Sequence, residues 1–218
     1  MQDGKLLTNA RAAELATKLS GAYKEARYYL NFKTPIDLVA AAIISAQTRD
    51  ETVNRLTPNL FSKYRSAKDY SSAKPKELQE EIRSVTFAEK KAENIINTCK
   101  VILDKYGGEV PKKMDQLIEL PGIGRKTANT IMINAYGIVE GIPVDTWVIK
   151  LSYRLGLSME TNPDKIEQDL MGKIPKPLWK KFAYVMKVHG KTLCKDVPIC
   201  SKCPVNSICP KNGVKEKI

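Results

Sequence analysis

The segment 120–129 holds the residues that most clearly could do chemistry. It reads LPGIGRKTAN, in which a tight turn with two nearby glycines runs into the start of a helix. Glycine lets a backbone approach a ligand closely, and the free N–H groups and dipole of a helix N-terminus favour an anion such as a phosphate diester. Lys126 lies in the first turn of that helix, where the dipole disfavours a cation and favours a neutral, nucleophilic amine. An ordinary helix corner with a surface lysine is the alternative.

A catalytic lysine needs a second functional group, and Asp145 is the candidate. It follows Gly141-Ile142-Pro143 and precedes a predicted helix. An aspartate at this place is also a common N-cap, because its side chain accepts hydrogen bonds from the first backbone amides of the helix. Position alone leaves both interpretations open.

Four of the five cysteines lie close together near the end of the sequence. Their spacing is C-x5-C-x2-C-x5-C, and they are Cys194, Cys200, Cys203 and Cys209. Residues 1–7 contain no apolar signal-peptide core, so we expect no secretion and favour metal ligation over disulfides. Four thiolates suit a tetrahedral zinc or a [4Fe–4S] cluster, and the single C-x2-C pair favours iron–sulfur. Cys99 stands alone in a helical pattern and is expected to be buried.

The chain is strongly basic. Its 218 residues include 36 Lys and Arg against 24 Asp and Glu, a formal net charge of +12, and this favours a polyanionic partner such as nucleic acid. Two stretches, 121–139 and 170–195, contain no acidic residue, and lysines crowd the second. A solvated lysine face is the alternative. No run approaches the ~18 apolar residues that span a bilayer, which excludes a membrane-embedded protein.

Helical patterns dominate, and no sustained strand alternation occurs, so the sequence predicts an all-α fold. Thr34-Pro35-Ile36-Asp37 is a helix start, and the apolar residues 38–44 that follow predict a helix buried in a bundle. Residues 211–218 are short and polar and are expected to fray. The other predicted helices cover residues 53–64, 75–85, 90–106, 114–120, 125–136, 146–155, 163–171 and 177–189.

The sequence resembles the endonuclease III family of helix-hairpin-helix DNA glycosylases. The resemblance extends from about residue 30 to residue 209 in a consistent order. The motifs that carry it are Ser45-Ala46-Gln47, Asp50 with Val53-Asn54, the segment 91–96 (KAENII), the segment 108–111 (GEVP), the block 120–129, Val144-Asp145-Thr146, His189-Gly190 and the four clustered cysteines.

The resemblance implies two helical domains with the active site in the cleft between them. Residues 28–138 would form a six-helix domain with the helix-hairpin-helix, and residues 1–27 plus 139–218 a second domain that holds a [4Fe–4S] cluster. Lys126 would attack C1′ of a flipped nucleotide, expel the base and form a Schiff base that allows β-elimination of the 3′ phosphate. Asp145, facing it, would take the proton of the amine and stabilise positive charge on the sugar.

The resemblance also implies a set of DNA contacts. Gln47 would fill the gap that the flipped base leaves, and Phe87 would wedge into the opposite stack, although a core aromatic is the alternative for Phe87. The remaining contacts would come from Leu120, Gly122, Gly124, Arg125 and Lys191. Three features depart from the family pattern: Thr86 replaces a glycine, Trp147 replaces a histidine, and the first cysteine gap, 195–199, has five residues where six are common.

The implied function is a bifunctional glycosylase and AP lyase that acts as a monomer on oxidised pyrimidines in duplex DNA. The expected location is cytoplasmic, with the nucleoid if the organism is a prokaryote. A glycosylase for T or U opposite G is one alternative, and a non-catalytic helix-hairpin-helix DNA-binding protein with zinc is another. His189, the only histidine, is expected to be a core residue rather than a catalytic one.

Overall fold

The computed structural model describes residues 4–218; residues 1–3, which belong to the polar first segment and to the predicted cluster-containing domain, lie outside the described residues. Within residues 4–218 all regular elements are helices, which confirms the all-α prediction. The chain divides into two units. We call Tyr29–Ile138 the central unit, and Met1–Tyr28 together with Val139–Ile218 the terminal unit.

The central unit is built around one fully buried helix, α2 (Pro35–Ser45). Thr34 closes a capping box with Asp37: the Thr34 hydroxyl accepts from the Asp37 amide, and the Asp37 carboxylate accepts from the Thr34 amide. All side chains of residues 36–44 are buried, as the sequence predicts. The other helices of the unit are α3 (Asp50–Lys63), α4 (Ala67–Ser71), α5 (Pro75–Glu81), α6 (Ala88–Tyr106), α7 (Met114–Ile118) and α8 (Arg125–Tyr136).

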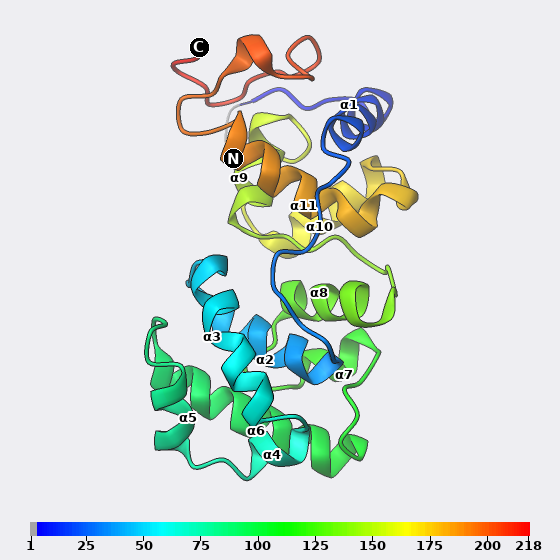
Figure 1. Cartoon of the computed structure of the whole chain (residues 1–218). Helices are drawn as coiled ribbons and strands as arrows, with labels where there is room; N and C mark the ends of the chain where they lie inside the picture. Colours follow the sequence, from blue (N-terminus) through cyan, green and yellow to red (C-terminus); the bar gives the residue numbers. More distant parts are fainter. Residues whose placement is uncertain (1–3) are drawn as a thin grey trace. The chain divides into compact units, whose positions relative to one another are not determined.

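Three of these helices pack directly on α2, namely α3, α6 and α8, as Figure 1 shows. Helices α4 and α5 pack on α6, and α7 packs on α8. Cys99, on α6, is fully buried as expected. The five-residue helix α4 escaped sequence analysis because it is too short to show a helical period.

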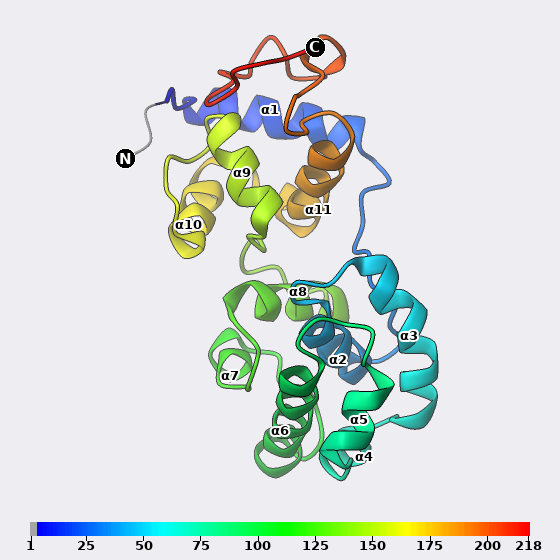
Figure 2. The same cartoon turned by 90° about the vertical axis from the view of Figure 1, so that its left-hand side faces the viewer.

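The terminal unit joins the two ends of the chain. It contains α1 (Asn9–Ala22), α9 (Thr146–Arg154), α10 (Pro163–Lys173), α11 (Lys176–Thr192) and a short 3₁₀ helix at Cys200–Lys202. Helix α1 packs on α10 and α11, and α11 packs on α9 (Figure 2). Helix α1, capped by Thr8, was not predicted, because only a narrow stripe of small and apolar side chains on it is buried.

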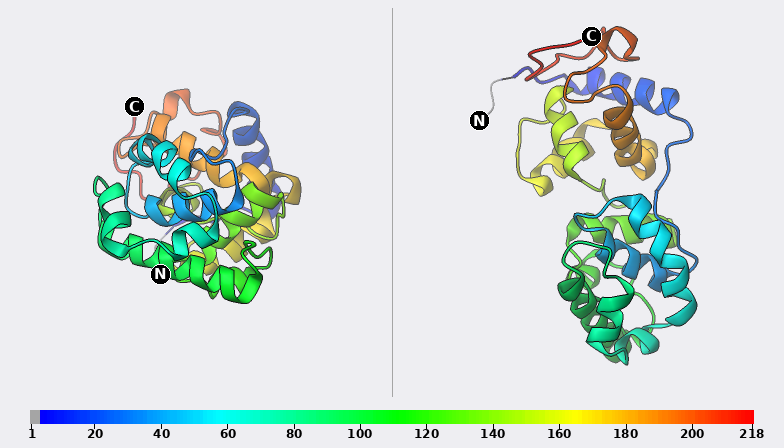
Figure 3. Two further views of the ribbon diagram at one scale, coloured as in Figure 1. Left: turned by 60° about the horizontal axis from the view of Figure 1, so that its bottom comes forward. Right: turned by 60° about the vertical axis from the view of Figure 1, so that its left-hand side comes forward.

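The last residues of the chain are ordered by hydrogen bonds, so the prediction of a frayed tail is wrong. The Asn212 side chain accepts from the Lys5 amide and donates to the carbonyls of Lys5 and Tyr153. The Ile218 amide donates to the Pro198 carbonyl. The segment around Lys5 therefore lies beside the segment around Asn212 in this unit, where the blue and red parts of the ribbon run close together (Figure 3). None of the helices in residues 4–218 has the length and apolar character of a membrane span.

We expect Asn212→Ala to destabilise the terminal unit by about 1–3 kcal/mol, because it leaves backbone groups of Lys5 and Tyr153 without partners in a buried place. Thermal unfolding followed by circular dichroism measures the effect. Asn97→Ala, at an exposed position of α6, is the matched control and should leave the melting temperature nearly unchanged. Equal melting temperatures for the two variants would contradict this account of the tail.

Candidate functional site

The turn between α7 and α8 is held in place by α6. Gly122 has φ +79°, and a Cβ on it would lie 3.0–3.2 Å from side-chain atoms of Asn94. The Thr98 hydroxyl donates to the Pro121 carbonyl. Leu120 is 2% exposed, so its side chain anchors the turn, and only its backbone is left to meet a ligand. The positive φ and the close contact to Asn94 therefore favour glycine at position 122.

Helix α8 starts directly after this turn, and no side chain caps it. Gly124 is the N-cap, and Arg125 and Lys126 are the first two helical residues, both exposed. The following residues 128–133 are buried and fix α8 in the unit. The structure thus presents the Lys126 side chain to solvent from a rigid helix start whose dipole favours anions.

Asp145 is the N-cap of α9, in the terminal unit. Its Oδ1 accepts from the amides of Trp147 and Val148, each at 2.9 Å. The N-cap interpretation is therefore confirmed. It does not exclude catalysis, because Oδ2 makes no hydrogen bond to any residue in the described range 4–218. The cap orients the carboxylate and leaves one oxygen available.

Trp147 locks the start of α9 against α11. Its ring lies on Gly190, where an added Cβ would be 2.2 Å from Cε3 of the indole. The Lys150 ammonium lies 5.4 Å from the centroid of the same ring. Trp147 is thus a packing element beside Asp145, and a side chain larger than glycine at 190 would collide with its ring.

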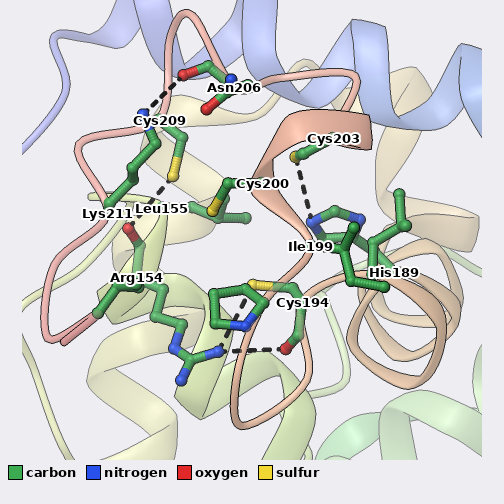
Figure 4. Close-up of a pocket in the computed structure, with 13 residues that line it drawn as sticks. Arg154, Leu155, His189, Cys194, Ile199, Cys200, Cys203, Asn206, Cys209 and Lys211 are labelled. Atoms are coloured by element: carbon green, nitrogen blue, oxygen red, sulfur yellow. Dashed lines mark hydrogen bonds between the residues drawn. The ribbon is translucent and has the colours of Figure 1, made fainter. Parts of the chain in front are cut away.

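The four clustered cysteines line one small cavity of about 20 Å³ in the terminal unit (Figure 4). Apolar side chains such as Leu155 and Ile199 complete the wall together with Arg154 and Lys211, and no carboxylate lines it. Burial raises the pKa of the Cys194 and Cys203 thiols and raises that of Cys209 to about 11. Among residues 4–218, no group of three or more His, Cys, Asp or Glu side chains is arranged to hold a metal ion.

His189 is a buried member of the cavity wall, as expected. Its Nδ1 is 2.9 Å from the Tyr23 hydroxyl, and its Nε2 is 3.9 Å from Sγ of Cys203. Burial lowers the pKa of His189 to about 4, so the ring is neutral. The histidine therefore supports a cysteine rather than exchanging protons.

Arg154 organises the shortened cysteine gap, and sequence analysis did not single it out. Its guanidinium donates to the carbonyls of Cys194, Lys195 and Asp196, and it lies 3.7 Å from Sγ of Cys194. Lys150 forms an ion pair with Asp196 at 2.6 Å. The loop is thereby tied to α9. An arginine in the last turn of a helix is the only sequence signal that could have pointed to this role.

The lysine-rich segment is largely one side of α11. Lys176, Lys180, Lys187 and Lys191 are separated by four, seven and four residues, a spacing that places them along one side of a helix. Lys180 and Lys191 are exposed. Lys173 differs, because its ammonium donates to the Leu157 carbonyl and so has a structural role.

Gln47 and Phe87 lie in two turns of the central unit that are joined by a hydrogen bond. Both residues are exposed and have positive φ, +53° and +57°. The Thr86 hydroxyl donates to the Gln47 carbonyl at 2.9 Å. Phe87 is 68% exposed, so the core-aromatic interpretation is wrong. An exposed aromatic side chain in a strained turn is available to a ligand.

Comparison with known proteins identifies the family. The model of the HhH-GPD superfamily of base excision DNA repair proteins matches residues 40–176, which is more than half of the chain. This chain belongs to that superfamily. It is 43% identical to endonuclease III of Synechocystis sp. over 184 residues, covering 84% of each chain. It is 40% identical to endonuclease III of Bacillus subtilis over 179 residues, covering 82% of this chain and 81% of that one. These relatives place the chain in the endonuclease III family.

Solved structures agree with this placement. A trapped endonuclease III–DNA covalent intermediate superposes with a TM-score of 0.90 at 36% identity, covering 95% of this chain and 98% of that one. A non-covalent endonuclease III–DNA complex superposes with a TM-score of 0.89 at 36% identity, covering 95% of this chain and 97% of that one. A thermostable thymine-DNA glycosylase, at 19% identity and a TM-score of 0.83, shares the fold.

We expect Gly190→Ala to cost about 1–3 kcal/mol of stability, because the methyl group overpacks the Trp147 ring and pushes the start of α9 aside. Gly172→Ala, also within a helix, is the matched control, since nothing lies within 4 Å of its added Cβ. Thermal unfolding of both variants measures the difference. Trp147→Ala should remove most of the Gly190→Ala penalty; an undiminished penalty would show that the ring is not its cause.

Proposed function

We propose that this protein excises oxidised pyrimidines from duplex DNA with Lys126 as its nucleophile and then cleaves the strand as an AP lyase. The chain is a base-excision repair DNA glycosylase and AP lyase, because it belongs to the endonuclease III family. The observation that carries the residue assignment is the exposed Lys126 on the second position of α8, behind a rigid glycine turn. A similar chain, at 36% identity, has been solved as a trapped covalent intermediate with DNA.

Lys126 would begin the reaction as a neutral amine. Its nitrogen forms a bond to C1′ of the flipped nucleotide while the bond from C1′ to the base breaks and the base leaves. Opening of the sugar then gives a Schiff base between the lysine and C1′. This electron sink allows loss of a proton from C2′ and departure of the 3′ phosphate, which cleaves the strand.

We assign the partner role to Asp145. The family resemblance supports this assignment, and so does the capped geometry, which holds the carboxylate by Oδ1 and leaves Oδ2 without a partner in residues 4–218. The free oxygen would accept the proton of the attacking amine and stabilise positive charge that develops on the sugar. The two units then correspond to the two domains of the family.

Contacts to DNA would come from three places. The amides of Gly122 and Gly124 and the uncapped start of α8 suit a phosphate diester, whereas the Ile123 amide already donates to the Leu120 carbonyl, and Arg125 adds a positive charge beside them. Lys191, with the lysines along α11, would contact the backbone in the terminal unit. Gln47 and Phe87 would enter the base stack.

We also propose that the four clustered cysteines hold a [4Fe–4S] cluster. An all-sulfur donor set around one cavity suits it, and Arg154 and Lys211 offset the negative charge that four thiolates bring. When bound, the cluster supplies metal–thiolate bonds that close residues 194–209 into one loop. The chemistry at C1′ needs only the lysine and the carboxylate.

We expect wild-type protein to form a covalent complex with abasic or thymine-glycol duplex when borohydride is present, because borohydride reduces the Schiff base. Lys126→Ala should abolish trapping yet still bind an abasic analogue. Lys105→Ala, which removes an exposed lysine of α6, is the control and should trap normally. Undiminished trapping by Lys126→Ala would overturn the mechanism. Faster excision of T or U opposite G than of thymine glycol would favour the mismatch alternative.

Asp145→Asn should separate capping from catalysis. The asparagine oxygen can still cap α9, so the melting temperature should stay close to that of the wild type, whereas single-turnover excision should fall by about 10²–10⁴-fold without the carboxylate. Asp145→Ala loses both functions and should also melt earlier. An active, stable Asp145→Asn protein would restrict Asp145 to the cap.

Purified protein should be brown and contain four irons and four sulfides per chain. Cys203→Ser should lose iron and melt at a lower temperature, because one ligand of the cluster is gone. Cys99→Ala removes the buried cysteine of α6 and should keep its iron. Stoichiometric zinc in colourless wild-type protein would contradict the cluster.

A further inference from the structure

Two strained turns stand next to each other on the central unit. Gln47 and Phe87 both adopt the left-handed backbone conformation, which is disfavoured for any residue with a Cβ. Such conformations persist only where the surrounding structure determines them, and they gather at functional sites. In the proposed function, these two residues are also the ones that enter the base stack of the DNA.

A buried lysine connects the two turns. Lys91, in the first turn of α6, is only 5% exposed. Its ammonium donates to the Ile44 carbonyl at 2.7 Å and to the Thr48 hydroxyl at 2.8 Å. Ile44 lies in the last turn of α2, where carbonyls lack helical partners and the helix dipole favours a cation. The lysine therefore ties the end of α2 to the start of α6.

Hydrogen-bond contacts continue from Lys91 to the two turns. The hydroxyls of Thr48 and Thr86 are 3.2 Å apart, and Thr86 gives its own proton to the Gln47 carbonyl at 2.9 Å. The Thr48 hydroxyl, which accepts from Lys91, has two acceptors within reach for its proton, the Thr86 hydroxyl and, at 3.4 Å, the Ala46 carbonyl. The resulting relay runs from Lys91 through Thr48 and Thr86 to Gln47, and Phe87 is bonded covalently to Thr86.

Burying the Lys91 ammonium costs free energy, because the charge loses its hydration. We therefore look for a function that offsets this cost. Lys91 makes no ion pair within residues 4–218, so its charge is met only by the Ile44 carbonyl and the Thr48 hydroxyl. Burial without a carboxylate lowers the pKa of Lys91 to about 8. An apolar side chain could fill the same space more cheaply, but it could not hold the two turns.

We propose that Lys91 and Thr86 are positioning residues that lock the Gln47 turn to the Phe87 turn, so that both side chains enter the DNA stack as one rigid unit. The inference rests on the proposed function of this surface. Thr86 supplies the hydroxyl that bonds the Gln47 carbonyl, and it directly precedes Phe87.

The sharpest test replaces the Thr86 hydroxyl without changing the size of the side chain. Thr86→Val removes both hydrogen bonds, and Thr86→Ser keeps the hydroxyl. Duplex with 2-aminopurine opposite a non-cleavable abasic analogue reports unstacking of the opposite base as a rise in fluorescence. We expect Thr86→Val to reduce this rise in fluorescence by at least half. The single-turnover rate of thymine glycol excision should fall about 10-fold, because the Phe87 side chain is misplaced. Thr86→Ser should restore both within about twofold.

Lys91→Met should have the same effect on fluorescence, and Lys90→Met is its matched control. Lys90 is the exposed neighbour, in an ion pair with Glu93, and its loss should leave fluorescence and rate unchanged. If Lys91→Met does not fold, the valine and serine variants of Thr86 decide the question. In a background that carries both Gln47→Ala and Phe87→Ala, Thr86→Val should have little further effect, because both side chains through which it acts are missing.

Borohydride trapping separates the two proposals. Absence of trapping by the wild type would overturn the proposed function itself. Normal trapping by the wild type, with wild-type fluorescence and rate for Thr86→Val, would overturn the positioning role alone. Loss of both signals in Thr86→Val that Thr86→Ser does not restore would also contradict it, since the hydroxyl would then not be the cause.

Discussion

Helix α2 has no solvent-exposed side, and this constraint arranges the whole central unit. Its apolar residues 36–44 must be covered in every direction, so α3, α6 and α8 pack around it. Complete burial of each large aliphatic side chain contributes about 1.5–3 kcal/mol to the stability of the unit. The features of the proposed site follow from it: α8 presents Lys126, α6 supports the glycine turn, and α2 ends just before Gln47.

Polar side chains position the turns and loops that the apolar core does not hold. In the central unit, Lys91 satisfies the end of α2 and so connects two surface turns that are 39 residues apart in sequence. In the terminal unit, Arg154 and Asn212 do the same for the cysteine loop and the tail, by bonding to backbone carbonyls and amides. Loops cannot bury enough apolar surface to be ordered by it, so hydrogen bonds from a few rigid side chains order them instead.

The starts of α8 and α9 differ in whether a side chain caps the first backbone amides. The start of α8 has no capping side chain, so its amides and dipole are available to an anion, and a lysine stands on it. The start of α9 is capped by Asp145, whose Oδ1 accepts from the amides of Trp147 and Val148 and whose Oδ2 makes no hydrogen bond within residues 4–218. A nucleophile and a base for the same reaction would thus both be oriented by helix termini, without any additional scaffold.

Local patterns in the sequence determined the helical fold class, the starts of α2 and α8, the buried α2 and Cys99, and the family, because capping, apolar runs and motif spacing are short-range signals. The roles of Lys126 and Asp145, the cluster and the domain division stay predictions of that resemblance. Only the tertiary structure decided that Phe87 is exposed, that the tail is ordered, that Gly190 lies under Trp147, and that Lys91 and Thr86 join two turns. Each of these depends on a contact between distant segments of the chain, and no local pattern encodes which partner a side chain meets across the fold.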